Sequence, residues 1–186
     1  MMIAGLVLAA GEGRRYGMPK ALVRTDGGLF VERAAAVLAE AGLDPVLVVI
    51  GAAADEVRAA APGLRTVVNS EWATGMASSL RAGLAALAGT PAGAVVVQLV
   101  DMPGVTPDAV RRVAAHASPR ALAMGGYEGR RSHPVLLGRE HWAGVAASAT
   151  GDRGARDYLR AHAADVRVIP VADVADDTDV DVPPRP

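Results

Sequence analysis

The sequence predicts an α/β fold in which helices cover both faces of a mostly parallel sheet, in three layers. Four almost wholly apolar runs alternate with alanine- and leucine-rich segments of helix length, a pattern typical of strands buried on both faces of a parallel sheet. The chain has 186 residues, 51% of them hydrophobic and only 3% aromatic. It is therefore long enough for one domain whose core consists of Ala, Val and Leu.

The elements follow one another from the N-terminus. The apolar runs IAGLVLA, PVLVVI, LRTVV and AVVVQLV predict strands at 3–9, 45–50, 64–68 and 94–100. Helices are expected at 29–41 and 76–88, then at 107–117 and 153–162, with short strands at 121–125 and 135–137 between the last two. No linker or repeat divides the chain, which predicts a single domain over 1–186. The acidic, proline-rich end ADDTDVDVPPRP is either a solvated tail or a segment folded back over the site.

Charge and composition exclude several classes of protein. The chain has 19 basic and 20 acidic residues, so we expect neither a nucleic-acid partner nor an anionic membrane. It has no cysteine, which excludes disulfides and thiolate metal sites. The apolar start lacks a basic leader and a cleavage pattern and runs at once into a charged loop. We therefore expect a cytoplasmic protein.

A glycine-rich, basic loop directly after the first strand predicts a phosphate site, because glycines let backbone N–H groups approach an anion. Its residues are Gly11, Gly13, Arg14, Arg15, Gly17 and Lys20. A P-loop is excluded, since no Ser or Thr follows the lysine, and the spacing GxGxxxG argues against a dinucleotide fold. A flexible connection with solvated charges remains the alternative.

Ligands of parallel sheets bind at the carboxyl ends of the strands, where three loops of this chain are expected to meet. The loop after the fourth strand begins with Asp101, followed by Met102-Pro103. A carboxylate there suits Mg²⁺, which bridges carboxylates to phosphates, but it would also cap the turn or the next helix. Arg15 is suited to grip two phosphate oxygens, and Lys20 to neutralise charge that develops during reaction. Arg14 is the cation most prone to point outward.

The loop NSEWATGM, which leads into the helix at 76–88, offers free N–H groups to a nucleobase or sugar. Trp72 lies either in the core or against a ligand. In the second half, His133 either lines an anionic substrate pocket or has a structural role. Asp152 is expected to cap the last helix, whose first turn carries Arg153 and Arg156. Cations at a helix N-terminus oppose the helix dipole, so these arginines are better placed to bind an anion than to stabilise the helix. No histidine pair has zinc-ligand spacing, and no GxSxG elbow occurs.

Together, LAAGEGRRYGMPK, GMASSLRAGL, DMP, HPVLLGR and TGDRGARDYL resemble one family along nearly the whole chain. It is that of the nucleotidyltransferases of molybdenum-cofactor maturation, the MobA-like NTP transferases, and most of all the CTP:molybdopterin cytidylyltransferase branch. The resemblance implies a Rossmann-like, doubly wound sheet of the nucleotide-diphospho-sugar transferase (GT-A-like) type. It also implies a nucleotide-binding half at 1–105 and an acceptor-binding half at 106–186.

The resemblance further implies roles for individual residues. Lys20, Arg15 and Asp101 would be catalytic, and His133, Asp152 and Arg153 would bind the acceptor. The candidate nucleotide contacts are Leu8, Ala9, Ala10, Gly11, Gly13, Asn69, Gly75, Met76 and Ser79. Asp101 and Asp181 would hold Mg²⁺, but the family end DIDTPEDL reads DVDVPPRP here, so Asp179 competes with Asp181 as the second ligand.

The implied reaction is attack of the terminal phosphate of molybdopterin on the α-phosphorus of CTP, releasing pyrophosphate. A phosphate monoester is already an anionic nucleophile, so no strong side-chain base is needed. The product would pass to a molybdenum enzyme or its maturation chaperone. CTP is favoured over GTP because the guanylyl branch carries LAGG where this chain has LAAG. The alternatives are a guanylyltransferase, a nucleotidyltransferase for another small phosphate, and a non-catalytic molybdopterin carrier.

Overall fold

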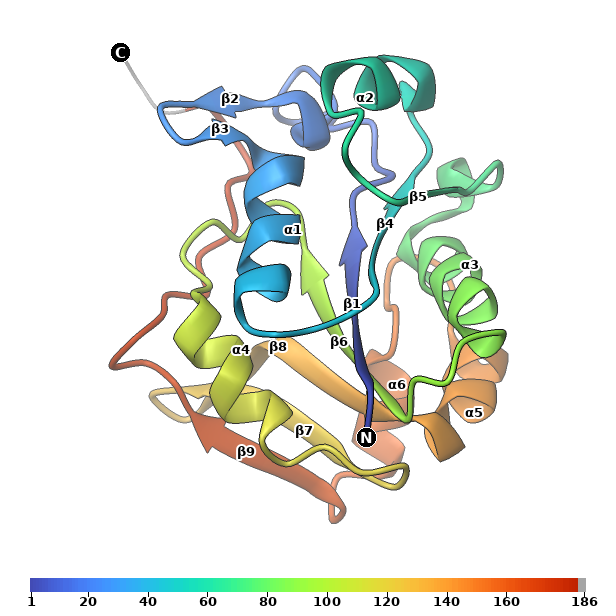
Figure 1. Ribbon diagram of the computed structural model, residues 1–186, viewed down its shortest axis with the longest axis vertical. Coiled ribbons are helices and arrows are strands. Elements are labelled where there is room, and N and C mark those ends of the chain that lie inside the picture. The colour runs from blue at the N-terminus through green and yellow to red at the C-terminus, as the bar shows by residue number, and fades with distance from the viewer. Residues whose placement is uncertain (184–186) are drawn as a thin grey trace.

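The computed structural model describes residues 1–183 and contains a seven-stranded sheet with helices on both faces (Figure 1). The strand order is β5-β4-β1-β6-β8-β7-β9, and only β8 runs antiparallel to its neighbours. The strands are β1 Ile3–Leu8, β4 Val46–Ile50, β5 Thr66–Val68, β6 Ala94–Leu99, β7 Leu122–Tyr127, β8 Arg130–Gly138 and β9 Val166–Pro170. The predicted α/β class and mostly parallel sheet are confirmed.

Each face of the sheet has its own apolar core, which explains why the strands read as continuous apolar runs. Helices α1 and α4 pack on one face, which includes Val7 and Val96. Helices α3 and α5 pack on the other, which includes Leu6 and Val95. The helices are α1 Phe30–Glu40, α2 Ala54–Ala60, α3 Met76–Ala88, α4 Pro107–Ala114, α5 Trp142–Ser148 and α6 Arg156–Ala161, and a small hairpin joins β2 Arg24–Thr25 to β3 Gly28–Leu29.

The second half of the chain departs most from the expected elements. The helix expected at 107–117 ends at Ala114, the one expected at 153–162 covers only Arg156–Ala161, and the strand expected at 135–137 extends over Arg130–Gly138. Helices α2 and α5 and strand β9 were not predicted. Helix α2 buries only Val57, so its sequence carries no apolar period. Strand β9 lies at the sheet edge and is largely exposed, so it lacks a continuous apolar run.

The acidic C-terminal segment folds back along the loop after β6. The backbone N–H of Asp176 donates to the carbonyl of Gly104 at 3.0 Å, and that of Val180 donates to the carbonyl of Asp101 at 2.8 Å. Of the two alternatives for this segment, the folded-back one is correct as far as Pro183; residues 184–186 lie outside the described residues. Over residues 1–183, no helix has the length and apolar character needed to cross a membrane.

Candidate active site

A cleft of about 580 Å³ lies beyond the carboxyl ends of β1 and β6. This volume falls within the range of roughly 300–1,000 Å³ typical of ligand sites. Its walls come from four separate segments: the glycine loop at 11–15, the turn at 72–76, the residues at 152–156 and the returning C-terminal segment. The end of β1, Lys20 and the residues Leu99, Val100 and Asp101 at the end of β6 complete the lining. The predicted meeting of loops at this sheet edge is thus observed.

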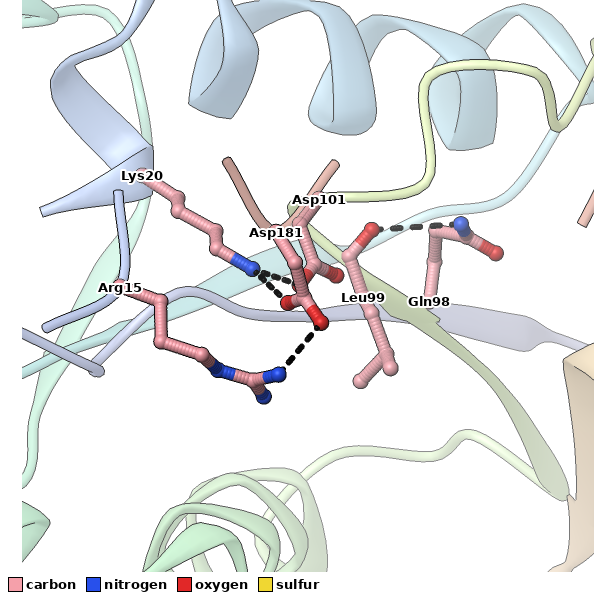
Figure 2. Close-up of polar contacts among 6 residues, drawn as sticks. All are labelled: Arg15, Lys20, Gln98, Leu99, Asp101 and Asp181. Atoms are coloured by element: carbon pink, nitrogen blue, oxygen red, sulfur yellow. Dashed lines mark hydrogen bonds and ion pairs between the residues drawn. The ribbon is translucent and has the colours of Figure 1, made fainter. Parts of the chain in front are cut away.

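Lys20 lies at the centre of a cluster of charges in this cleft (Figure 2). Its Nζ atom donates hydrogen bonds of 2.7 Å to Asp101 Oδ2 and of 2.7 Å to Asp181 Oδ1. The guanidinium of Arg15 pairs with the other oxygen of Asp181 at 3.0 Å. The side chain of Lys20 is only 15% exposed, whereas that of Arg15 is 77% exposed, so the two cations differ in how firmly they are held.

The carboxylates around Lys20 shift its protonation equilibrium. Burial by itself lowers the pKa of the ammonium, but the hydrogen bonds and charges of Asp101 and Asp181 outweigh burial and raise it. The hydrogen bond from Lys20 in turn lowers the pKa of Asp181. Lysine and aspartate are therefore both charged at neutral pH, as an ion pair.

Asp179 joins Asp101 and Asp181, with one carboxylate oxygen of each lying within 4.8 Å of the others. Asp179 and Asp181 were alternatives for the second metal ligand. The structure places both beside Asp101, so their positions do not exclude either. Carboxylate oxygens are hard donors of the kind that Mg²⁺ and Mn²⁺ prefer, so the donor set fits such an ion.

The glycine loop takes its shape from backbone conformations that side chains rarely adopt. Gly13 has φ +67°, and a Cβ atom built there would lie 1.9 Å from the carbonyl oxygen of Met18. The Gly17 N–H closes the loop by donating to the carbonyl of Gly13 at 2.8 Å. Arg14 is exposed and pairs with Glu12 beside it, in agreement with the outward orientation considered for it.

The N-terminus of α3 faces the cleft and is held by a distant segment. The Met76 N–H donates to Asp152 Oδ1 at 3.3 Å, and the Ala77 N–H donates to the carbonyl of Gly151 at 2.9 Å. The expectation that Asp152 caps the last helix is wrong, because α6 begins at Arg156 and Ala155 is its N-cap residue. Gly75 permits this contact, because a Cβ atom at this position would collide with Gly151 and Asp152.

The predicted nucleotide contacts fall into two groups. Leu8, Ala9, Gly11, Gly13, Gly75 and Met76 line the cleft. Ala10, Asn69 and Ser79 are buried and do not line it. Asn69 donates to the hydroxyls of Ser78 at 2.8 Å and Ser79 at 3.0 Å. These three buried side chains therefore hold the loop in place from the interior of the protein. Trp72 is half-buried in the cleft wall and packs against Gly51.

The predicted acceptor residues are not all brought together. His133 lines a second pocket beside the cleft, and Asp152 lines the cleft itself. Arg153 lines neither of these cavities; it pairs with Asp157 at 3.1 Å. Arg156, which sequence analysis placed beside Arg153 as a candidate for anion binding but which was not among the residues assigned to the acceptor, lines both. The sequence places both arginines near one helix start, but only the fold decides which of them faces the cavities.

Gln98 is a further residue that sequence analysis missed. It is 1% exposed, and its amide nitrogen donates to the carbonyl of Leu99, two residues before Asp101, at 3.2 Å (Figure 2). Its amide oxygen is buried with no partner among residues 1–183. As a polar residue in the apolar run AVVVQLV, Gln98 was a visible signal in the sequence.

Comparison with known proteins identifies the family of this fold and site. The family model of the MobA-like NTP transferase domain matches residues 5–166, most of the chain. The chain belongs to the MobA-like NTP transferase family. By family it is a nucleotidyltransferase, as the resemblance in its motifs predicted. The finer cytidylyl assignment is not decided by this match.

Named relatives of this MobA-like protein carry different activities. It is 36% identical to the nicotine blue oxidoreductase of Paenarthrobacter nicotinovorans, over 96% of this chain and 92% of that protein. It is 35% identical to the molybdenum cofactor guanylyltransferase of Rhodobacter capsulatus, over 67% of this chain and 64% of that protein. The crystal structure of Rv0371c from Mycobacterium tuberculosis H37Rv has a TM-score of 0.81 at 30% identity, covering 97% of this chain and 93% of that one. The same protein has also been solved in complex with manganese.

Proposed function

We propose that this protein transfers CMP from CTP to the terminal phosphate of a molybdopterin-type acceptor and releases pyrophosphate. The observation that carries the proposal is the position of Lys20 between Asp101 and Asp181, next to a glycine loop at a strand-end cleft. A cation and carboxylates beside backbone N–H groups suit the binding of a triphosphate. We further propose that the product passes to a molybdenum enzyme or its maturation chaperone.

In the proposed reaction, an oxygen of the acceptor phosphate attacks the α-phosphorus of CTP, and the bond from that phosphorus to the pyrophosphate oxygen breaks. The acceptor is already anionic, so the chain has only to align the two phosphates and neutralise charge. Lys20 and Arg15 would stabilise the leaving pyrophosphate, with Lys20 released from its carboxylates when the nucleotide binds. The glycine loop would hold the phosphates through its N–H groups.

A divalent cation is part of this proposal. Asp101, Asp179 and Asp181 would hold Mg²⁺, and the convergence of their oxygens supports this choice of residues. When bound, the ion supplies positive charge that neutralises the phosphates. The manganese complex of Rv0371c, at 28% identity and a TM-score of 0.80, adds support for divalent-metal binding here.

The choice of nucleotide is tested by mass spectrometry of the product formed from molybdopterin with CTP or GTP. The names of the guanylyltransferase relatives support GTP, and LAAG at Ala10 supports CTP. We expect the CTP product to dominate. Ala10 is buried behind the cleft wall, so its methyl group can act on the base only through its neighbours, and Ala10→Gly should erode the preference without reversing it, since one methyl group is worth only ~1–3 kcal/mol. Equal use of GTP and CTP by the unaltered protein would contradict the cytidylyl proposal and leave only the assignment as a nucleotidyltransferase.

A second candidate is an oxidoreductase activity, favoured by the 36% identity to nicotine blue oxidoreductase over almost the full length of both chains. The chain has no cysteine to serve as a redox group, so this candidate needs a bound redox cofactor; the cleft of about 580 Å³ is where we would place a nucleotide hydride donor. Loss of the absorbance of reduced nicotinamide in the presence of a quinone-type dye, without pyrophosphate release, would favour this candidate.

Replacing Asp101 with Asn is the most direct test of the proposed chemistry. The amide keeps the shape of the side chain but removes the charge beside Lys20, so we expect pyrophosphate release to fall at least ~100-fold, because a bound metal contributes several kcal/mol. Asp173→Asn is the control, since Asp173 is an exposed carboxylate paired with Arg112 outside the cleft. Retention of a tenth or more of the rate by the Asp101 variant would contradict the assignment.

A further inference from the structure

We infer that Arg130 is a positioning residue for the candidate metal site, because its pair with Asp177 holds the C-terminal segment where Asp179 and Asp181 reach Asp101. The inference rests on the proposed function, since these three carboxylates are the proposed Mg²⁺ ligands. Arg130 does not line the cleft, so it acts through Asp177 and not on the substrates.

The C-terminal segment is tied to the rest of the chain by few contacts near the site. After β9 it runs past α4 to the end of β6 (Figure 1). The N–H groups of Asp176 and Val180 donate to backbone carbonyls of the loop after β6. Within residues 1–183, the Arg130–Asp177 pair is the only side-chain hydrogen bond or ion pair that joins residues 176–180 to another element. Without it, this stretch is held by its backbone bonds alone.

The pair has the geometry of a strong ion pair. Arg130 Nη1 donates to Asp177 Oδ2 at 2.7 Å, and Nη2 donates to Oδ1 at 2.9 Å. The side chain of Asp177 is only 10% exposed. Most surface ion pairs contribute little to stability, but a bidentate pair with one nearly buried partner is stronger. A carboxylate that lost Arg130 would have to regain water, which requires the segment to move outward.

Arg130 projects from a fixed point on the hairpin formed by β7 and β8. It lies opposite Tyr127 in the ladder, and only two residues connect these positions. Those residues, Glu128 and Gly129, have φ +48° and +86°. Two left-handed residues in succession are typical of the type I′ turn, whose twist matches that of the flanking strands. The hairpin is therefore a rigid base from which Arg130 can hold the mobile end of a charged segment in place.

Charge and position predict opposite effects of removing Arg130. The segment carries acidic side chains at 176, 177, 179 and 181, which repel one another. Loss of a nearby positive charge leaves this region more negative, which by itself strengthens the binding of a divalent cation. Loss of positioning weakens binding, because the ligands no longer converge. The sign of the change in metal affinity therefore distinguishes the two effects.

The test measures Mn²⁺ binding by calorimetry, without nucleotide, in Arg130→Gln and Arg130→Lys. We expect Arg130→Gln to lower Mn²⁺ affinity about tenfold, as is usual when a residue that orients metal ligands is lost. Arg130→Lys keeps the charge but loses the fork, so its affinity should lie between those of Arg130→Gln and the unaltered protein. Melting temperatures establish that both variants fold.

Arg112→Gln is the matched control. It also removes one positive charge and breaks a bidentate pair, that with Asp173 of the same segment at 2.6 and 2.8 Å. Asp173 lies before the backbone bond from Asp176 to Gly104, so the ligands beyond that bond should stay in place. We expect Mn²⁺ affinity to change less than about twofold, as for an exposed ion pair.

Hydrogen exchange gives a second readout that needs no metal. The Val180 N–H, bonded to the carbonyl of Asp101, should exchange at least ~10-fold faster in Arg130→Gln, because local opening becomes easier. The double variant Arg130→Gln/Asp177→Asn should exchange no faster than Arg130→Gln, since both changes break the same pair.

Any one of four results overturns the inference: unchanged or tighter Mn²⁺ binding in Arg130→Gln, an equal loss in Arg112→Gln, unchanged exchange at Val180, or no Mn²⁺ binding by the unaltered protein. Unchanged Mn²⁺ affinity in Arg130→Gln, with pyrophosphate release by the unaltered protein, would leave the proposed function intact. Conversely, the expected loss of affinity, with no pyrophosphate release from CTP by the unaltered protein, would contradict the proposed function and leave the role of Arg130 intact.

Discussion

Lys20 is the only lysine in a chain with 19 basic residues, the other 18 being arginines. An ammonium is a compact point charge with rotatable donors, whereas a guanidinium is a planar group whose donors point in fixed directions. Lys20 donates to two carboxylates from distant parts of the chain, a geometry that a compact donor satisfies at 2.7 Å on each side. The only lysine of the chain thus lies where carboxylates from two distant segments converge in the cleft.

Replacing Lys20 with Met should reduce kcat by about 100-fold and change KM much less, because the charge matters most when pyrophosphate leaves. Lys20→Arg keeps the charge but not the shape, so it should recover only part of the rate. Steady-state kinetics with CTP checks both variants. A change confined to KM would assign Lys20 to ground-state binding instead.

His133 gives the protein a predicted pH dependence of stability. Its pKa is lowered from the ordinary 6.5 by burial, so the unfolded chain takes up this proton at a higher pH than the folded chain does. The free energy of unfolding should therefore fall as pH drops below 6.5, by at most ~1.4 kcal/mol per pH unit from this group. Denaturant unfolding over a pH series measures the slope.

The comparison variants are His133→Gln and His116→Gln. The first should flatten the slope below pH 6.5, while the second should leave it unchanged, because His116 is exposed. The same slope in both variants would show that His133 titrates normally in the folded protein.

Among the elements, loops build the site and the strands only hold it in place. The glycine loop after β1, the turn before α3 and the loop after β6 have no apolar pattern of their own, yet each is fixed by specific contacts. Asp152 and Gly151 hold the start of α3, and Gly17 closes the glycine loop on Gly13. Backbone geometry at a few glycines therefore determines whether N–H groups face the cleft.

Gly13→Ala should disrupt nucleotide binding with a smaller effect on the core. A methyl group there meets the Met18 carbonyl at 1.9 Å and requires φ +67°, so the loop must move. We expect CTP affinity to fall at least ~10-fold, measured by calorimetry. Gly63→Ala is the matched control, because a Cβ atom there has no neighbour within 4 Å. Unchanged affinity in Gly13→Ala would show that the loop does not bind phosphates in this conformation.

At the scale of the whole molecule, the C-terminal segment closes the site by crossing back from the far side of the sheet. Strand β9 lies at one edge, and the chain then returns past α4 to the end of β6 (Figure 1). It brings Asp179 and Asp181 to Lys20, which follows β1, and to Asp101, which follows β6. The site is complete only when the last residues of the fold are in place.

A chain that ends at Thr178 should therefore fold but lose activity. It keeps every strand and helix, so the melting temperature should shift by no more than ~4 °C, the equivalent of about 1 kcal/mol for a domain of this size. Pyrophosphate release should fall at least ~100-fold, since two carboxylates are lost. A chain that ends at Pro183 is the control and should remain fully active. Activity in the shorter chain would show that Asp101 alone suffices.

Sequence reasoning predicted the fold class, the family, six of the seven strands of the large sheet and four of the six α-helices found in residues 1–183. Apolar runs and glycines at fixed spacing are local signals, so they can be recognised without knowledge of the tertiary structure. Lys20, Arg15 and Asp101 were found in this way. The second half, with its edge strand β9 and short helices, gave weaker signals because little of each element is buried.

Which residues of the second half reach the site depends on how the elements pack together. Arg156 instead of Arg153 lines the cavities, Asp152 holds α3 instead of α6, and Asp179 lies beside Asp181 instead of competing with it. Asn69 and Ser79 were brought together behind the cleft, not into it. These outcomes depend on contacts between residues far apart in the sequence; Lys20 and Asp181, for example, are 161 positions apart. No local pattern encodes such distances, because they are set by how the helices and strands pack on both faces of the sheet.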